Sequence, residues 1–142
     1  ECFDILHSGH VSFLHRVKQM GDVLIVGINN DESIKRLKGE SRPVNPLSDR
    51  LQVLSGLSSV DHIIPFGSAN DDTPVSLIKI VKPHVFAKGG DYTMEKLPEA
   101  SVVEKLGGQI VFVPLVPDHS TTETIRRITH IDANAEKKAV EI

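Results

Sequence analysis

The sequence contains a single cysteine, Cys2, among its 142 residues. One cysteine excludes an intrachain disulfide and a thiolate metal cluster, and it is typical of a protein from a reducing cytoplasm. Long hydrophobic runs are also lacking: the longest, residues 23–28, is far too short to cross a bilayer and instead predicts a buried strand. We therefore expect a cytoplasmic protein without a signal peptide or a membrane span.

An excess of charge of one sign is equally absent. The formal net charge is −3, and the basic residues are dispersed among acidic ones. The sequence thus offers no basic face for nucleic acid and no polybasic patch for a membrane surface. Its length suits one domain with a real core and is too short for two ordinary domains. An anionic ligand must therefore be bound by a local group of residues.

Short apolar segments alternate with helical patterns along the chain. This order predicts an α/β fold of the Rossmann-like type, an open and mostly parallel sheet with helices on both faces. We place one domain at residues 1–128 and expect a C-terminal tail, residues 129–142, to form a loosely packed helix or a frayed end. The predicted strands are residues 23–28, 63–66, 85–87 and 110–113, and the predicted helices are residues 9–20, 47–57, 74–81, 94–106 and 121–128.

The most informative motif is His-Ser-Gly-His at residues 7–10, shortly after Phe3 and Asp4. Two imidazoles and a flexible glycine lie where an extended apolar segment turns into a helix. A helix that begins there presents backbone N–H groups and a partial positive charge to a bound phosphate. The less favoured alternative is a purely structural pair, with one histidine in the core and one in the first helical turn.

Three further segments converge on one edge of the predicted sheet, because ligands of open α/β sheets bind at the carboxyl ends of the strands. Residues 88–91 follow a strand, and their two glycines let the backbone approach a nucleotide, although an ordinary turn explains them equally well. Residues 118–122 open the last helix with hydroxyl groups that suit an anion, although plain capping has the same composition. Residues 36–43 form a basic loop that can close over a triphosphate, although most basic loops merely face water.

Taken together, six motifs resemble the cytidylyltransferase-like nucleotidyltransferase superfamily over nearly the whole chain. Two of them, residues 42–46 and 88–92, favour the D-glycero-β-D-manno-heptose 1-phosphate adenylyltransferases, the nucleotidyltransferase part of the heptose-precursor enzymes. The six are Cys-Phe-Asp-Ile-Leu-His-Ser-Gly-His (2–10), Arg-Leu-Lys-Gly (36–39), Arg-Pro-Val-Asn-Pro (42–46), Val-Asp (60–61), Lys-Gly-Gly-Asp-Tyr (88–92) and Ser-Thr-Thr (120–122).

The resemblance implies transfer of AMP from ATP to a sugar 1-phosphate, with heptose 1-phosphate favoured, to give an ADP-sugar and pyrophosphate. It implies catalytic roles for His7, His10 and Lys38. Mg²⁺ is expected to travel mainly on the phosphates of ATP, since no carboxylate cage is evident, with Asp4 close enough to contribute. The residues that the resemblance implies in binding the nucleotide are Phe3, Asp4, Gly9, Arg50, Lys88, Gly89, Gly90, Asp91, Ser120, Thr121 and Thr122.

Two other functions stay open at this stage: a cytidylyltransferase that uses a polyol or alcohol phosphate, and a non-catalytic nucleotide-binding module. The oligomeric state also stays open, a homo-oligomer included, as does a fused sugar-kinase domain upstream in the intact protein. In the family a strand and a glycine precede the Cys-Phe-Asp element, whereas this chain begins at Glu1. We therefore expect a fragment of a longer product whose first, central strand is largely missing, and which is poorly stable or weakly active as it stands.

Overall fold

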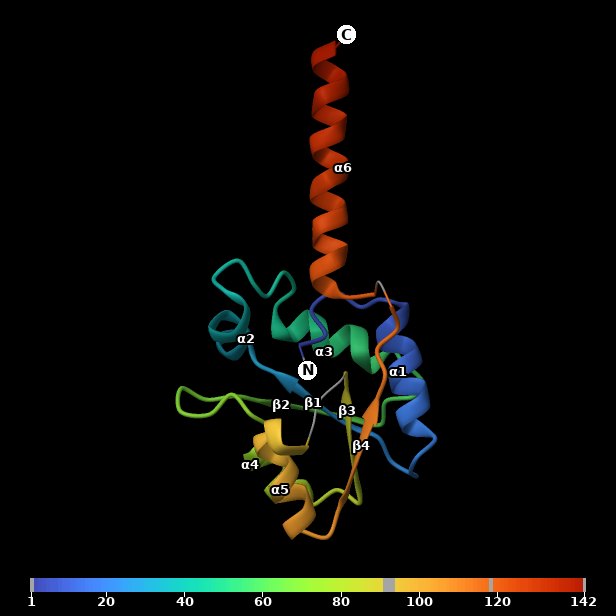
Figure 1. Ribbon diagram of the computed structural model, residues 1–142, viewed down its shortest axis with the longest axis vertical. Coiled ribbons are helices and arrows are strands. Elements are labelled where there is room, and N and C mark those ends of the chain that lie inside the picture. The colour runs from blue at the N-terminus through green and yellow to red at the C-terminus, as the bar shows by residue number, and fades with distance from the viewer. Residues whose placement is uncertain (1, 91–93, 118, 142) are drawn as a thin grey trace.

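Strands and helices alternate along the part of the chain that the computed structural model describes, residues 2–90, 94–117 and 119–141, with side chains up to residue 131. The strands are β1 (Ile25–Asn29), β2 (His62–Phe66), β3 (Val85–Gly89) and β4 (Gln109–Val113). The helices are α1 (Ser8–Lys18), α2 (Asp31–Lys38), α3 (Leu47–Ser55), α4 (Val75–Val81), the 3₁₀ turn η1 (Met94–Lys96), α5 (Pro98–Lys105) and α6 (Thr121–Glu141). This order confirms the predicted α/β class (Figure 1).

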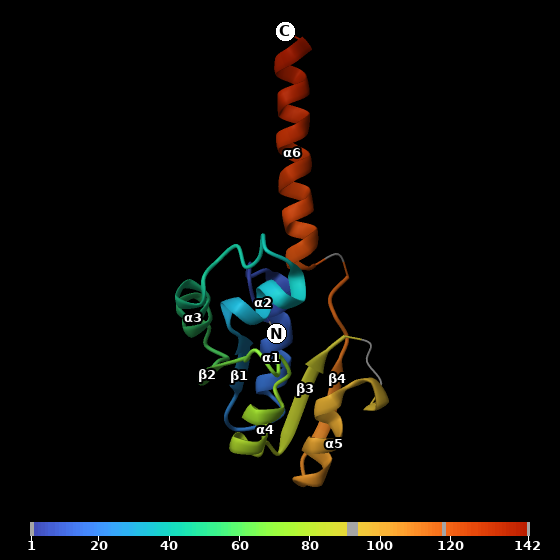
Figure 2. The ribbon, with the colours of Figure 1, turned by 90° about the vertical axis from the view of Figure 1, so that its left-hand side faces the viewer.

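The strands pair in parallel, as predicted, but in two separate pairs within the described residues. Strand β1 pairs with β2, with Ile25 opposite His62, and β3 pairs with β4, with Val85 opposite Gln109. Figure 2 shows β3 and β4 as a unit beside the β1–β2 pair. The arrangement is therefore a parallel sheet divided between β1 and β3.

An apolar cavity of about 490 Å³ lies at this division, between β1 and β3. Helix α1 lines one part of it and helix α4 another, with side chains that include Phe13, Leu14, Leu77 and Ile78. Residues 85–88 of β3 are only half-buried, whereas a central parallel strand is normally covered on both faces. The cavity thus separates the two pairs of parallel strands.

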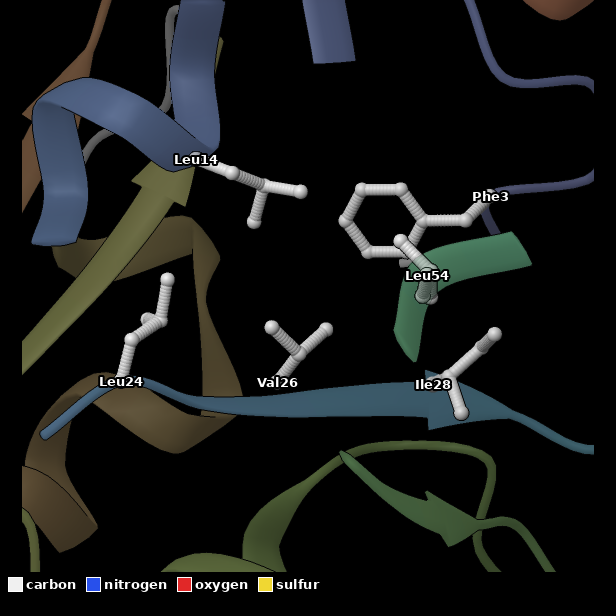
Figure 3. Packing of buried hydrophobic residues seen from close by; sticks show 6 residues of the cluster. All are labelled: Phe3, Leu14, Leu24, Val26, Ile28 and Leu54. Carbon is white, nitrogen blue, oxygen red and sulfur yellow. The ribbon is translucent and has the colours of Figure 1, made fainter. Parts of the chain in front are cut away.

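The main core lies between one face of β1 and helices α1 and α3. Alternate residues Leu24, Val26 and Ile28 point to this face, as the two-residue period of a strand requires, and they meet Leu14 of α1 and Leu54 of α3 (Figure 3). Burying each such side chain contributes about 1.5–3 kcal/mol. Phe3 joins this cluster with 5% of its surface exposed, so the core anchors the segment that leads into the His-Ser-Gly-His motif.

Asp61, from the Val-Asp motif, joins three elements at the amino end of β1. Its Oδ2 accepts hydrogen bonds from the Leu24 N–H at 2.7 Å and from Lys18 Nζ at 2.5 Å. The Leu24 N–H and the Lys18 ammonium hold the pKa of the Asp61 carboxyl below its usual value. Because ligands of such sheets bind at the opposite, carboxyl edge, these contacts give Asp61 a structural function.

Helix α2 is an element that the sequence analysis missed. Residues 36–38, predicted to begin a basic loop, instead form its last turn, and only Ser33 and Ile34 of the helix are buried. Only two of its eight residues, Ile34 and Leu37, are apolar, so the sequence analysis took the segment for a polar loop. The helix begins at a proper cap, since Asn30 Oδ1 accepts a hydrogen bond from the Ser33 N–H at 2.9 Å.

Two other helices differ from their predicted bounds. The segment predicted as one helix over residues 94–106 is split into η1 and α5, because Pro98 begins α5 and cannot continue a preceding turn. Helix α6 runs without a break through residue 128, the predicted end of the domain, and extends away from the rest of the chain (Figures 1 and 2). Among the described residues, no helix is long and apolar enough to span a membrane.

Filling the cavity between β1 and β3 is expected to stabilise the chain. We predict a higher Tm for a version that carries about ten additional N-terminal residues, five of them β-branched, which is enough for a strand and a turn. Each kcal/mol gained raises the Tm by about 2–4 °C in a domain of this size. Thermal unfolding followed by circular dichroism measures the change, with an equally long glycine–serine extension as the control. Equal Tm values for the unextended chain and both extended chains would contradict the prediction.

Candidate active site

Two histidines cap the first turn of α1 in a reciprocal manner. His7 is the N-cap residue, and its Nδ1 accepts a hydrogen bond from the Gly9 N–H at 3.1 Å. His10 Nδ1 in turn accepts a hydrogen bond from the His7 N–H at 3.3 Å. This is the arrangement of a capping box, built from imidazoles rather than from a hydroxyl and a carboxylate. The motif predicted for phosphate binding therefore begins the helix where it was expected.

The capping contacts determine which tautomer each imidazole adopts. A backbone N–H is only a donor, so each Nδ1 must act as an acceptor, and the hydrogen of each neutral ring lies on Nε2. The two rings stack with centroids 3.7 Å apart and planes inclined by 22°. The first turn of α1 thus carries two neighbouring rings whose Nδ1 atoms accept and whose Nε2–H groups are donors.

Burial lowers the pKa of His7 below its usual value, and the charge of a third histidine, His119, lowers that pKa further. A lowered pKa means that His7 stays neutral at a pH where an exposed imidazole has begun to take up a proton. Its Nδ1 therefore stays available as a cap, and its Nε2 stays a donor, through the neutral range.

His119 lies against this pair, from the segment that leads into α6. Its ring centroid is 6.1 Å from that of His7. The contact depends on Gly9: a Cβ on that residue would lie 2.9 Å from ring atoms of His7 and 3.0 Å from the His119 Cβ. The sequence analysis selected the hydroxyl groups of residues 120–122 and missed His119, although its place at a predicted helix start was the available signal.

The first turn of α6 docks beside the same segment. Thr121 Oγ1 donates a hydrogen bond to the Ile5 carbonyl at 3.3 Å, a contact across almost the whole sequence. Ser120 Oγ accepts a hydrogen bond from the Glu123 N–H at 3.0 Å, and Thr122 is exposed in the first turn. The predicted Ser-Thr-Thr residues therefore lie near the histidines, where the backbone N–H groups of a helix start favour an anion.

Asp4 is buried, and its carboxylate holds the loop before α3. Oδ2 accepts from Arg42 Nε at 2.7 Å and from the Val44 N–H at 2.9 Å, while Oδ1 accepts from the Asn45 N–H at 2.9 Å. Burial raises the pKa of Asp4, but the hydrogen bonds from Asn45, Val44 and Arg42 outweigh it, so the pKa lies below its usual value. Asp4 is therefore ionised at neutral pH and joins the Arg-Pro-Val-Asn-Pro motif to the site.

Arg50 has a fully buried side chain whose guanidinium contacts four protein oxygen atoms. Nη1 donates to the carbonyls of Cys2 and Asn29 at 2.9 and 2.8 Å, Nε donates to the Asn45 carbonyl at 3.0 Å, and Nη2 donates to Asp31 Oδ1 at 2.7 Å. These contacts fix the carboxyl end of β1 to the segments around it. A contact between Arg50 and a phosphate stays a prediction.

The remaining predicted residues lie in two other places. Lys38 is exposed at the end of α2. Lys88 belongs to β3 rather than to a loop, with its Nζ 3.6 Å from Glu99 Oε1. Gly89 is buried, and a Cβ there would lie 3.1 Å from Leu115 and 3.4 Å from Phe13 of α1. Gly90 donates from its N–H to the Val113 carbonyl, and Asp91 lies outside the described residues.

A sequence model described as cytidylyltransferase-like matches residues 2–128. The chain belongs to the cytidylyltransferase-like family. This result confirms the resemblance drawn from the six motifs and the nucleotidyltransferase class of enzyme that it implied.

Named relatives and a solved structure agree with this assignment. The bifunctional protein HldE of Mesorhizobium japonicum is 48% identical over 127 residues, which cover 89% of this chain and 25% of that protein. HldE of Hyphomonas neptunium is 50% identical over 126 residues, with coverages of 89% and 25%. The crystal structure of a lipopolysaccharide core biosynthesis protein from Thermoplasma volcanium GSS1 has a TM-score of 0.63 and 32% identity, and the match covers 82% of this chain and 91% of that one. The chain thus spans about a quarter of the length of these curated relatives.

Replacing Gly9 with alanine is expected to destabilise the chain and to disturb the histidine pair. Alanine has a helix propensity about 1 kcal/mol better than glycine, but overpacking costs about 1–3 kcal/mol, and the new Cβ would overlap the His7 ring and the His119 Cβ. We predict a lower Tm for Gly9→Ala. In the control variant Gly21→Ala the new Cβ meets nothing within 4 Å, so its Tm should stay or rise. Thermal unfolding that shifted both variants alike would count against a packing constraint at Gly9.

Proposed function

We propose that this family member transfers AMP from ATP to a sugar 1-phosphate, with heptose 1-phosphate as the favoured acceptor, and releases pyrophosphate. The observation that carries the proposal is the stacked pair His7 and His10, whose Nε2–H donors lie at the start of α1 beside the first turn of α6. The names of the similar proteins, HldE and a lipopolysaccharide core biosynthesis protein, support a sugar acceptor. An activity that consumes ATP fits a cytoplasmic location.

The proposed reaction needs no covalent intermediate with the protein. An oxygen of the ionised sugar phosphate attacks the α-phosphorus of ATP, a new P–O bond forms, and the bond between the α-phosphorus and the bridging oxygen breaks. Pyrophosphate leaves with the electron pair of that bond, so no activated serine or cysteine is needed. The protein must align the two phosphates and stabilise the charge that develops between them.

We assign a separate role to each group of proposed residues. His7 and His10 donate through Nε2–H to the phosphate oxygens around the α-phosphorus. Ser120, Thr121 and Thr122, with the backbone N–H groups of the first turn of α6, support the leaving pyrophosphate. Lys38 reaches the phosphates from the end of α2, and residues 88–91 lie by the nucleoside.

The donor set of the protein fits a Mg²⁺ ion that is bound mainly through the phosphates of ATP. Asp4, the acidic residue of the motif, already accepts hydrogen bonds on both carboxylate oxygens. Among the described residues, no group of three or more His, Cys, Asp and Glu side chains is placed to hold a metal ion. When bound, Mg²⁺ would neutralise part of the phosphate charge, and the chain's residues would orient the phosphates that carry it.

The relatives named as bifunctional are about four times as long as the stretch that this chain matches. We propose that a sugar kinase occupies part of the remaining length in the intact protein. Such a kinase would supply the sugar 1-phosphate that the nucleotidyltransferase consumes.

The proposed reaction is tested by pyrophosphate release. The chain and its strand-extended version are incubated with Mg²⁺, with ATP or CTP, and with a panel of sugar 1-phosphates, polyol phosphates and alcohol phosphates. We expect release with ATP and a sugar 1-phosphate, strongest with heptose 1-phosphate and with the extended chain. Release with CTP and a polyol or alcohol phosphate would favour the cytidylyltransferase alternative. Nucleotide binding without release for any pair would favour a non-catalytic module.

Replacing His10 with alanine is predicted to lower kcat by a factor of about 10² or more, because a donor to developing charge acts in the transition state. Steady-state kinetics of pyrophosphate release measure the effect. His15→Ala is the matched control, since His15 lies on the exposed side of the same helix and should leave kcat unchanged. A change confined to KM for His10→Ala would rule out the transition-state contact.

A further inference from the structure

The two ring nitrogens of His119 have different surroundings. Nδ1 lies 2.7 Å from the carbonyl oxygen of Pro117. Because a carbonyl oxygen only accepts, Nδ1 must carry a hydrogen and donate it. This is the opposite tautomer from that of His7 and His10, whose Nδ1 atoms accept. In the neutral His119 ring, Nε2 is therefore an acceptor, and it becomes a donor only when the ring takes up a proton.

The fold holds His119 against the first turn of α1. Its Cβ lies 3.0 Å from where a Cβ on Gly9 would be, and its ring lies 6.1 Å from that of His7. Thr121, two residues on, is tied to Ile5 by a hydrogen bond. His119 is nevertheless exposed, so its imidazole borders both the histidine pair and solvent.

We propose that His119 is a third phosphate-binding imidazole of this site, which contacts the β- and γ-phosphates of ATP, and then the leaving pyrophosphate, through Nε2–H. This inference rests on the proposed function. His119 lies against His7 and directly precedes Ser120, so it lies where the leaving group is expected. Phosphate oxygens only accept hydrogen bonds, so Nε2 must donate while Nδ1 still donates to Pro117. Binding of the polyphosphate therefore charges the ring, and the ring takes its proton from solvent.

The surrounding charges are compatible with a proton on His119. The titratable and charged side chains in the nearest described turns are His7 and His10 at the start of α1, and Glu123, Arg126 and Arg127 on α6. Burial lowers the pKa of His7, and its Nδ1 and that of His10 accept hydrogen bonds from backbone N–H groups. The Glu123 carboxylate is bound by Arg126 Nε at 3.0 Å. Compared with the charged side chains of the described residues, a bound polyphosphate would then be the dominant negative charge beside His119.

Two substitutions of His119 test the roles of its two ring nitrogens separately. Asparagine at this position keeps a donor near the place of Nδ1 for the Pro117 carbonyl but has no atom at the place of Nε2. Glutamine places an amide N–H near the position of Nε2 and gives up the contact with Pro117. We expect His119→Asn to raise the Kd of inorganic pyrophosphate about tenfold or more, the usual effect of losing a hydrogen bond to a charged group. His119→Gln should stay within about threefold of the parent chain, and AMP, which lacks the β- and γ-phosphates, should bind all three proteins alike.

Isothermal titration calorimetry with inorganic pyrophosphate, ATP and AMP gives these constants, and titrations in two buffers of different ionisation enthalpy count the protons taken up. We expect proton uptake when pyrophosphate binds to the parent chain and less uptake with His119→Asn. Comparing the parent chain with the two variants removes the protons that pyrophosphate itself exchanges, because these are the same for all three proteins. Where one variant fails to fold, the other still tests the contact. Unchanged pyrophosphate affinity in His119→Asn, equal losses for pyrophosphate and AMP, a larger loss in His119→Gln than in His119→Asn, or equal proton uptake in the parent chain and His119→Asn would each overturn the inference.

The outcomes also distinguish this inference from the proposed function. A parent chain that binds ATP and releases pyrophosphate, together with an unaffected His119→Asn variant, would overturn only the assignment of His119. A parent chain that binds neither ATP nor pyrophosphate would overturn both.

Discussion

The guanidinium of Arg50 is the contact on which the carboxyl edge of this fold depends. It reaches from α3 to the carbonyls of Cys2, Asn29 and Asn45 and to the carboxylate of Asp31. Those oxygen atoms belong to the segment before the histidine motif, the end of β1, the loop before α3 and the start of α2. A buried guanidinium with its donors satisfied is stable, whereas its removal would leave several buried acceptors without partners. Arginine suits this position because its planar group addresses several directions at once.

The site is assembled from the two ends of the domain. Residues 2–10 come first in the sequence and residues 119–122 come last, and they meet through the Thr121–Ile5 hydrogen bond and the close approach of His119 to Gly9. The buried carboxylate of Asp4 adds the loop at residues 42–45 to the same assembly. Bringing together residues so far apart in sequence costs chain entropy. Tertiary packing offsets that cost. The candidate site is therefore a property of the whole fold and not of the histidine motif alone.

Much of this could be predicted from the sequence, for physical reasons that differ from residue to residue. The strands were found because β-branched apolar runs are local signals, and the start of α1 was found because the histidine motif follows an extended apolar segment. Helix α2 was missed because only two of its eight residues are apolar, and the burial of Arg50 was missed because a buried arginine and an exposed one look alike in sequence. His119 lies in the predicted segment 118–122, but its contact with His7 could not be predicted, because no local pattern encodes a distance between residues so far apart in sequence.

The reciprocal cap of His7 and His10 has a consequence for acid conditions. The same lone pairs on Nδ1 that begin α1 also keep the Nε2–H donors in place. A proton added to Nδ1 of His7 would oppose the Gly9 N–H with a second donor, so the ring would have to turn away and the first turn of α1 would fray. In this chain, protonation of His7 and unwinding of the first turn of α1 are therefore coupled: acid conditions that protonate His7 also oppose the cap that begins its helix.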